Sequence, residues 1–130
     1  MRRIAILGST GSVGRATLSV IARHANLFRV VALCAHRSTE TVAAQVREHS
    51  VPIAVIVDPD ALEGADDLPT AKWRTGPDAV TEIVTDPDVD VVVNAIVGAA
   101  GLKATLAALR AGKRLALANK ESLVAGGPLV

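Results

Sequence analysis

The sequence has 130 residues, of which 14 are lysine or arginine and 13 are aspartate or glutamate, so the formal net charge is +1. Half of the residues are hydrophobic and only 2% are aromatic. This balance indicates one globular domain with an aliphatic core. It excludes a disordered tail and a nucleic-acid-binding protein that depends on bulk positive charge or on aromatic stacking.

The sequence also argues against a membrane protein. Its richest apolar stretch, residues 91–102, contains Asn94 and is too short to cross a bilayer. The apolar run 4–7 is interrupted by glycine and serine, so it is not interpreted as a signal peptide. The single cysteine, Cys34, cannot form an internal disulfide and is expected to be a buried, unreactive thiol. We therefore expect no membrane partner and a cytoplasmic location.

The chain begins with a predicted strand, a glycine-rich turn and a helix. Residues 3–7 are an apolar run that predicts a buried strand, and three glycines follow within residues 8–14. Apolar residues then recur at the spacing of one helical face, at Leu18, Ile21, Ala22 and Ala25. Residues 29–35 are a nearly continuous apolar run, which is typical of a central parallel strand covered on both faces.

A second helix and a third strand follow. Ser38 or Thr39 is expected to begin the helix, and residues 53–57 predict the strand. The apolar residues that mark this helix are Val42, Ala43 and Val46. Residues 58–70 are rich in Pro, Asp and Gly and predict a loop with room for one helical turn. Trp73 is expected on a short additional strand.

The remaining elements repeat the alternation. Residues 77–84 predict a short helix and residues 89–95 another strand. A long helix that ends near Arg110 comes next. The apolar residues that mark this helix are Leu102, Leu106 and Leu109. Residues 114–118 predict the last strand, and Asn119 is expected to cap a final helical turn.

Strands that alternate with helices predict an α/β fold, with a doubly wound, mostly parallel sheet and helices on both faces. Ligands of such sheets bind beyond the carboxyl ends of the strands. Unusual stretches directly follow four of the expected strands, at residues 8–14, 36–39, 97–101 and 119–121. Their shared position predicts one ligand site. The aspartates at 58, 60, 66, 67, 86, 88 and 90 are interpreted as solvated loop residues, because a metal site needs several converging ligands.

The first stretch, LGSTGSVG, has its glycines at positions 8, 11 and 14 and not in the plain G-x-G-x-x-G spacing. Free N–H groups at the start of a helix suit a pyrophosphate, and here they belong to Thr10, Gly11, Ser12 and Val13. Gly8 would permit a tight turn and Gly14 a close approach of helix and strand. A glycine-rich bend without a ligand is the alternative, but the order strand, glycines, helix favours dinucleotide binding.

The end of the second strand indicates which dinucleotide binds. An NAD-binding domain usually carries Asp or Glu there to hold the ribose hydroxyls, whereas this chain has His36, Arg37 and Ser38. Arg37 could bind a 2′-phosphate, with Ser38 hydrogen bonding to it, which favours NADP(H). The alternative is a solvated arginine, a serine that only caps a helix and a surface histidine.

Two later strand ends leave more than one interpretation open. Asn94 could contact a ligand or simply hydrogen bond at a strand end. Lys120 could bind an anionic substrate or polarise a carbonyl, while Asn119 and Glu121 could hydrogen bond to ribose or amide groups. An N-cap, a solvated lysine and a first-turn glutamate explain the same three residues equally well.

Four segments span the chain in order: ILGSTGSVG, FRVVALCA, NAIVGAAGL and LALANKESLVAGG. In these segments the chain resembles the 1-deoxy-D-xylulose 5-phosphate reductoisomerase family, and the last two are the most specific. The resemblance implies a Rossmann-like, NADPH-binding domain over residues 1–130. It also implies a homodimeric full-length enzyme of the non-mevalonate isoprenoid pathway. This enzyme rearranges 1-deoxy-D-xylulose 5-phosphate and reduces the resulting aldehyde to 2-C-methyl-D-erythritol 4-phosphate.

The resemblance implies roles for individual residues as well. The pyrophosphate region would be bound by Thr10, Gly11, Ser12 and Val13. The 2′-phosphate side would be held by His36, Arg37 and Ser38, although positions 36 and 38 are often Gly and Asn in the family. Asn119 and Glu121 would contact NADPH, and Lys120 would contact the sugar phosphate substrate.

A divalent metal, Mg²⁺ or Mn²⁺, binds the substrate's oxygens in this family, through carboxylates that lie beyond the NKESLV segment. The sequence ends before these carboxylates and before the family's C-terminal domain, so we expect the chain alone to bind the cofactor without catalysis. Two alternatives stay open. One is a stand-alone NADP-binding module. The other is a different NADP-dependent oxidoreductase such as a semialdehyde dehydrogenase, for whose catalytic cysteine Cys34 is badly placed.

Overall fold

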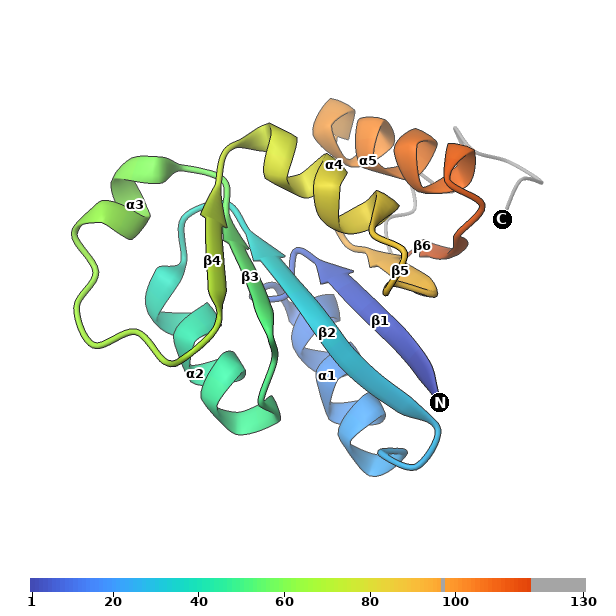
Figure 1. The fold of residues 1–130 in the computed structure, drawn as a ribbon, viewed down its shortest axis with the longest axis horizontal. Helices are drawn as coiled ribbons and strands as arrows, with labels where there is room; N and C mark the ends of the chain where they lie inside the picture. Colours follow the sequence, from blue (N-terminus) through green and yellow to red (C-terminus); the bar gives the residue numbers. More distant parts are fainter. Residues whose placement is uncertain (97, 118–130) are drawn as a thin grey trace.

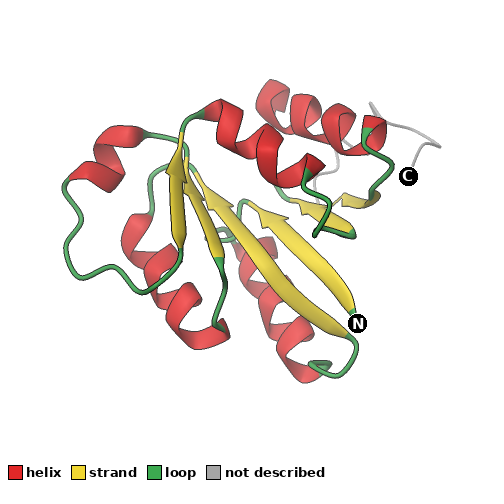
Figure 2. Ribbon diagram, in the orientation of Figure 1, coloured by secondary structure: helices red, strands yellow, loops and turns green. Residues whose placement is uncertain are grey.

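A computed structural model describes residues 1–96 and 98–117 of the chain. Within these residues, six parallel strands form one sheet in the order β4-β3-β2-β1-β5-β6. The strands are β1 (Arg2–Leu7), β2 (Phe28–Ala35), β3 (Ile53–Ile56), β4 (Lys72–Thr75), β5 (Val91–Asn94) and β6 (Arg114–Leu117). The helices are α1 (Ser12–Arg23), α2 (Thr39–His49), α3 (Pro59–Glu63), α4 (Pro77–Thr85) and α5 (Gly98–Arg110). Figure 2 shows the strands between two groups of helices.

The two faces of the sheet are covered by different helices. Along β1, Ile4 and Ile6 pack into the same buried cluster as residues of α1 and α2. The alternate residues Ala5 and Leu7 pack with residues of α4 and α5. Figure 1 shows these two pairs of helices on opposite sides of the sheet. Alternate residues of the strand therefore face different pairs of helices, so that helices cover both faces of the sheet. The structure confirms the predicted doubly wound, Rossmann-like fold.

Helix α2 buries the three residues that mark it in the sequence, whereas the predicted apolar face of α1 is confirmed only in part. In α2 the residues Val42, Ala43 and Val46 are all buried. In α1 the buried residues are Gly14, Leu18 and Ile21, whereas Ala22 is exposed and Ala25 lies beyond the end of the helix. The close approach at Gly14 turns the face that it shares with Leu18 and Ile21 toward the sheet.

The leucines that predict α5 do not form its buried face. Its buried residues are the small ones, Gly101, Ala104, Thr105 and Ala108. Leu106 is 40% exposed, and Leu102 and Leu109 are only half-buried. The physical reason is distance: a Cβ atom at Gly101 would lie 2.1 Å from the carbonyl oxygen of Ile96, so the helix approaches the strand ends too closely for large side chains.

The less regular middle of the chain agrees with expectation. The loop after β3 holds one short helix, α3, and Trp73 lies on β4, an edge strand. Strand β5 is shorter than the predicted range 89–95. The predicted helical cap at Asn119 lies outside the described residues. In the described ranges, no helix combines the length and the hydropathy needed to cross a membrane.

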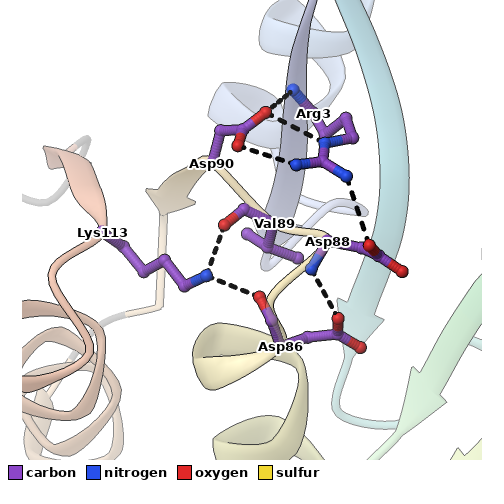
Figure 3. Close-up of polar contacts among 6 residues, drawn as sticks. All are labelled: Arg3, Asp86, Asp88, Val89, Asp90 and Lys113. Atoms are coloured by element: carbon purple, nitrogen blue, oxygen red, sulfur yellow. Dashed lines mark hydrogen bonds and ion pairs between the residues drawn. The ribbon is translucent and has the colours of Figure 1, made fainter.

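Polar side chains fasten the amino-terminal edge of the sheet (Figure 3). Arg3 on β1 forms ion pairs with Asp88 and Asp90, and the Asp86 carboxylate accepts a hydrogen bond from the N–H of Asp88. The Lys113 ammonium donates to the carbonyl oxygens of Asp86 and Val89. The interpretation of these aspartates as merely solvated is therefore wrong, because the parallel strands bring Arg3 next to the turn before β5.

Candidate functional site

The carboxyl ends of β1, β2, β3 and β5 meet at one edge of the sheet. Chain order reverses there, because β1 lies between β2, which follows it, and β5, which starts a second half of the sheet. A cleft of about 380 Å³ opens at this edge between the strand ends and helices α4 and α5. Its lining comprises Gly8, Thr10, Gly11, Cys34, Ala35, His36, Val57, Pro77, Val80, Thr81, Ala95, Ile96, Ala100, Lys103 and Ala104.

The turn after β1 has a shape that only glycine permits at two positions. Gly8 has φ +78, which side chains rarely adopt. A Cβ at Gly14 would lie 2.3 Å from the carbonyl oxygen of Gly8 and 2.6 Å from the Cα of Ser9. The first turn of α1 therefore packs directly on the turn after β1, whereas the sequence predicts a close approach of helix and strand. The N–H groups of Gly8 and Ser9 donate to the carbonyl oxygen of Cys34 at 2.8 and 3.1 Å, which ties the turn to β2.

A buried pair of polar side chains holds the same turn from α2. Ser9 Oγ donates to Gln45 Oε1 at 2.8 Å, and Gln45 Nε2 donates to the carbonyl oxygen of Ser9 at 2.9 Å. Sequence reasoning missed both residues. The available signal was a glutamine that shares the buried face of α2 with Val42 and Val46.

The start of α1 offers free backbone donors, and among them Thr10 lines the cleft. No acceptor among residues 1–96 and 98–117 pairs with the N–H groups of Thr10, Ser12 or Val13. The N–H of Gly11, by contrast, already contacts the carbonyl oxygen of Gly8 at 3.3 Å. The first turn of α1 carries no acidic residue. Free donors and a helix dipole without a competing carboxylate suit an anion such as a phosphate.

The three residues after β2 are all exposed, and His36 also lines the cleft. Arg37 Nε forms an ion pair with Asp58 Oδ2 at 3.1 Å, and 69% of the Arg37 side chain remains exposed. Ser38 occupies the N-cap position of α2, but its side chain makes no capping hydrogen bond. Its hydroxyl is therefore not committed to the helix.

Sequence reasoning missed Asp58, which it placed among the solvated loop aspartates. This residue is the N-cap of α3: its Oδ1 accepts from the N–H of Asp60 at 3.0 Å, and Pro59 follows at the first helical position. The backbone N–H of Asp58 donates to the carbonyl oxygen of His36 at 2.9 Å. The Asp-Pro pair after a strand was the signal for the cap; the contact with Arg37 depends on the pairing of β2 with β3.

The structure favours the purely structural interpretation of Asn94. Its side chain is fully buried, and Nδ2 donates to the carbonyl oxygen of Gly101 at 2.7 Å and to Thr105 Oγ1 at 2.9 Å. Its Oδ1 accepts from the N–H of Ile96 at 3.0 Å. Both amide hydrogens are thus used to hold the start of α5 against β5.

Two further residues of the cleft, Cys34 and Lys103, differ in their charge and reactivity. Burial raises the pKa of the Cys34 thiol to about 12, so it is protonated at neutral pH and unsuited to nucleophilic catalysis. Lys103, which sequence reasoning missed, brings an exposed ammonium from α5 to the cleft. The predicted ligand residues Asn119, Lys120 and Glu121, and Val97 of the predicted turn, lie outside the described residues.

Comparison with known proteins agrees with this geometry. A model of the family described as 1-deoxy-D-xylulose 5-phosphate reductoisomerase matches residues 4–127. A protein of that name from Mycolicibacterium smegmatis is 53% identical over 130 residues. The match covers 99% of this chain but 32% of that relative, so the chain spans about a third of the length of the curated protein it matches.

Solved structures agree as well. The chain is similar to the 1-deoxy-D-xylulose 5-phosphate reductoisomerase from Zymomonas mobilis in complex with NADPH, with a TM-score of 0.82 and 41% identity. That match covers 98% of this chain and 34% of the other. A second similar structure is DOX-P reductoisomerase in complex with NADPH, fosmidomycin and magnesium, with a TM-score of 0.84, 41% identity and coverage of 95% and 31% respectively.

Proposed function

This chain belongs to the 1-deoxy-D-xylulose 5-phosphate reductoisomerase family, and we propose that it forms the NADPH-binding domain of such an enzyme. The proposed NADPH-binding domain comprises residues 1–130. The catalytic metal site and the rest of the substrate site belong to parts of the family protein that the chain does not match, since it spans 32% of its M. smegmatis relative.

The main support for the proposal comes from the free backbone N–H groups at the start of α1. Its free N–H groups at Thr10, Ser12 and Val13 stand at the reversal point of the sheet, and Gly14 lets the helix come close to the turn. These features suit the pyrophosphate of a dinucleotide. Gly11 contributes less by hydrogen bonding than the sequence suggests, because its N–H already contacts Gly8. Its role is to let the backbone approach the phosphates.

The end of β2 supports NADPH over NADH. Arg37 directly follows the cleft residue His36, at the strand end where NAD-binding domains usually carry a carboxylate for the ribose hydroxyls. Ser38 adds an uncommitted hydroxyl, and His36 lines the cleft at the adenosine side. Together these three side chains would bind the 2′-phosphate.

The reaction of the whole enzyme is the conversion of 1-deoxy-D-xylulose 5-phosphate to 2-C-methyl-D-erythritol 4-phosphate in the non-mevalonate isoprenoid pathway. The bound nicotinamide supplies the hydride. In this proposal Asn119 and Glu121 contact NADPH and Lys120 contacts the sugar phosphate. The family's Mg²⁺ or Mn²⁺ takes its carboxylate ligands from outside this chain. The enzyme is a cytoplasmic homodimer.

Cofactor titrations test the proposal. NADPH should bind the chain more tightly than NADH, and Arg37→Ala should weaken NADPH by roughly tenfold or more while changing NADH little. The quenching of Trp73 fluorescence or the emission of bound nicotinamide can report binding. Equal affinities of the unmodified chain for NADPH and NADH would refute the 2′-phosphate role of Arg37.

A further inference from the structure

The Arg37 guanidinium is held from one side. Its Nε contacts Asp58 Oδ2 at 3.1 Å, while 69% of the side chain remains exposed. A guanidinium has five N–H donors on three nitrogens, and the ion pair with Asp58 is made at Nε. The N–H groups of Nη1 and Nη2 are left for another acceptor. Among the described residues, Asp58 is the single charged partner of Arg37.

Asp58 itself is well fixed. Its side chain is 23% exposed, and its two oxygens have different partners, since Oδ1 accepts from the N–H of Asp60 and Oδ2 faces Arg37. Its backbone N–H donates to the carbonyl oxygen of His36, and the N–H of Val57 donates to that of Ala35 at 3.0 Å. The loops after β2 and β3 are thus fastened together, and the carboxylate cannot move independently of the segment that carries Arg37.

We propose that Asp58 is a positioning residue that makes the site selective for a 2′-phosphorylated nucleotide. By pairing with Nε, it restricts the orientations of the Arg37 guanidinium before the ligand arrives and leaves Nη1 and Nη2 for the 2′-phosphate, so that less side-chain freedom is lost on binding. This inference rests on the proposed role of Arg37 in NADPH binding. It assigns the selectivity to a pair of residues on two strand ends, and not to the arginine alone.

The pairing also explains why a carboxylate near this site does not favour NADH. In NAD-binding domains an acidic residue at the end of the second strand accepts hydrogen bonds from ribose hydroxyls and repels a 2′-phosphate. Here the carboxylate follows the third strand, and its oxygens are engaged by Arg37 and by the N–H of Asp60. Its charge is balanced by Arg37, and each of its oxygens already has a partner.

Calorimetry on the complete chain can measure the affinities for 2′,5′-ADP and for 5′-AMP, which differ only in the 2′-phosphate. The affinity for 2′,5′-ADP divided by that for 5′-AMP therefore reports the contribution of the 2′-phosphate. Their ratio should fall by roughly five- to tenfold in Asp58→Ala, because neighbouring groups couple by this much. In an Arg37→Ala background, Asp58→Ala should change the ratio no further. Asp58→Asn should also lower the ratio, since its one oxygen cannot serve both Arg37 and the α3 cap. Circular dichroism and unchanged 5′-AMP affinity confirm folding.

Asp60→Ala is the matched control. It removes the same charge two residues away without touching Arg37 and should leave the ratio unchanged. An unchanged or raised ratio in both Asp58→Ala and Asp58→Asn would overturn the inference. An equally large fall of the ratio when Asp58→Ala is made in the Arg37→Ala background would overturn it as well. If Arg37→Ala lowers the ratio while the Asp58 variants do not, the inference alone fails. If Arg37→Ala also has no effect, the proposed 2′-phosphate site fails with it.

Discussion

Arg3 holds both carboxylate oxygens of Asp90. Its Nε donates to Oδ2 and its Nη2 to Oδ1, each at 3.1 Å, and its backbone N–H donates to Oδ2 at 2.8 Å (Figure 3). The contact joins the first strand to the start of β5 at the edge of the sheet farthest from the cleft. The Arg3 side-chain hydrogen bond, above all, lowers the pKa of Asp90 from 3.8 to about 2.

The lowered pKa predicts how stability depends on pH. Because the carboxylate is favoured in the folded state, Asp90 stabilises the fold above its unfolded pKa of 3.8, and this contribution is lost as the pH falls toward about 2. Asp90→Asn should therefore lower the melting temperature at pH 7, and the difference from the unmodified chain should shrink below pH 3.8. Asp66→Asn, in an exposed loop, is the control. A difference that stays constant down to pH 2 would contradict the assignment.

Gly14→Ala should damage both stability and cofactor binding. The added Cβ would lie 2.3 Å from a backbone oxygen, so α1 must move away from the turn. We expect a loss of roughly 1–3 kcal/mol in the free energy of unfolding, measured in urea, together with weaker NADPH binding. Gly64→Ala is the matched control, because no atom lies within 4 Å of its added Cβ. Similar losses in both variants would show that the close approach at Gly14 is not the cause.

The Ser9–Gln45 pair should behave as a unit. Ser9→Ala leaves Gln45 Oε1 buried without its donor, which should lower the free energy of unfolding by about 1–3 kcal/mol. Gln45→Met should cost a similar amount because it leaves the Ser9 hydroxyl and carbonyl without their partner. The double variant should be less destabilised than the sum of the two changes. Strict additivity in urea denaturation would mean that the two side chains stabilise the turn independently.

Cys34 should be inert in the folded protein. It is the only thiol of the chain, and burial raises its pKa to about 12, so iodoacetamide at pH 8 should label it slowly in buffer and quickly in denaturant. Cys34→Ser should leave NADPH affinity nearly unchanged. Fast labelling of the native chain, or loss of activity in a complete enzyme that carries only this change, would revive a catalytic role for the cysteine.

The sequence predicted the fold well because its main signals are local. Apolar runs and helical spacing reveal each strand and helix, and the alternation of the two implies a parallel sheet. The face of α5 was missed because leucines dominate a hydrophobicity pattern, whereas close packing at Gly101 selects small side chains. The distance between helix and strand decides whether the large or the small side chains of α5 face the sheet. That distance depends on tertiary packing and cannot be seen in the local sequence.

The candidate site was predictable in position and less so in detail. Parallel strands bring their carboxyl ends together, so the order of the elements along the chain suffices to place the glycine turn and Arg37 at one edge. The partner of Arg37 was missed because Asp58 lies on a different strand end, and its role depends on the pairing of β2 with β3. The buried pair Ser9–Gln45 was missed for the same reason, since its two residues lie 36 positions apart in the sequence.

The central place of β1 in the sheet affects how the chain folds. Its neighbour β2 follows after one helix, but its other neighbour, β5, comes much later, and the Arg3–Asp90 contact joins residues 87 positions apart. Closing so long a loop is entropically slow, so β1, β2 and β3 are expected to assemble first. Until β5 docks, β1 has an open hydrogen-bonding edge, which makes this interval the one most exposed to aggregation during synthesis.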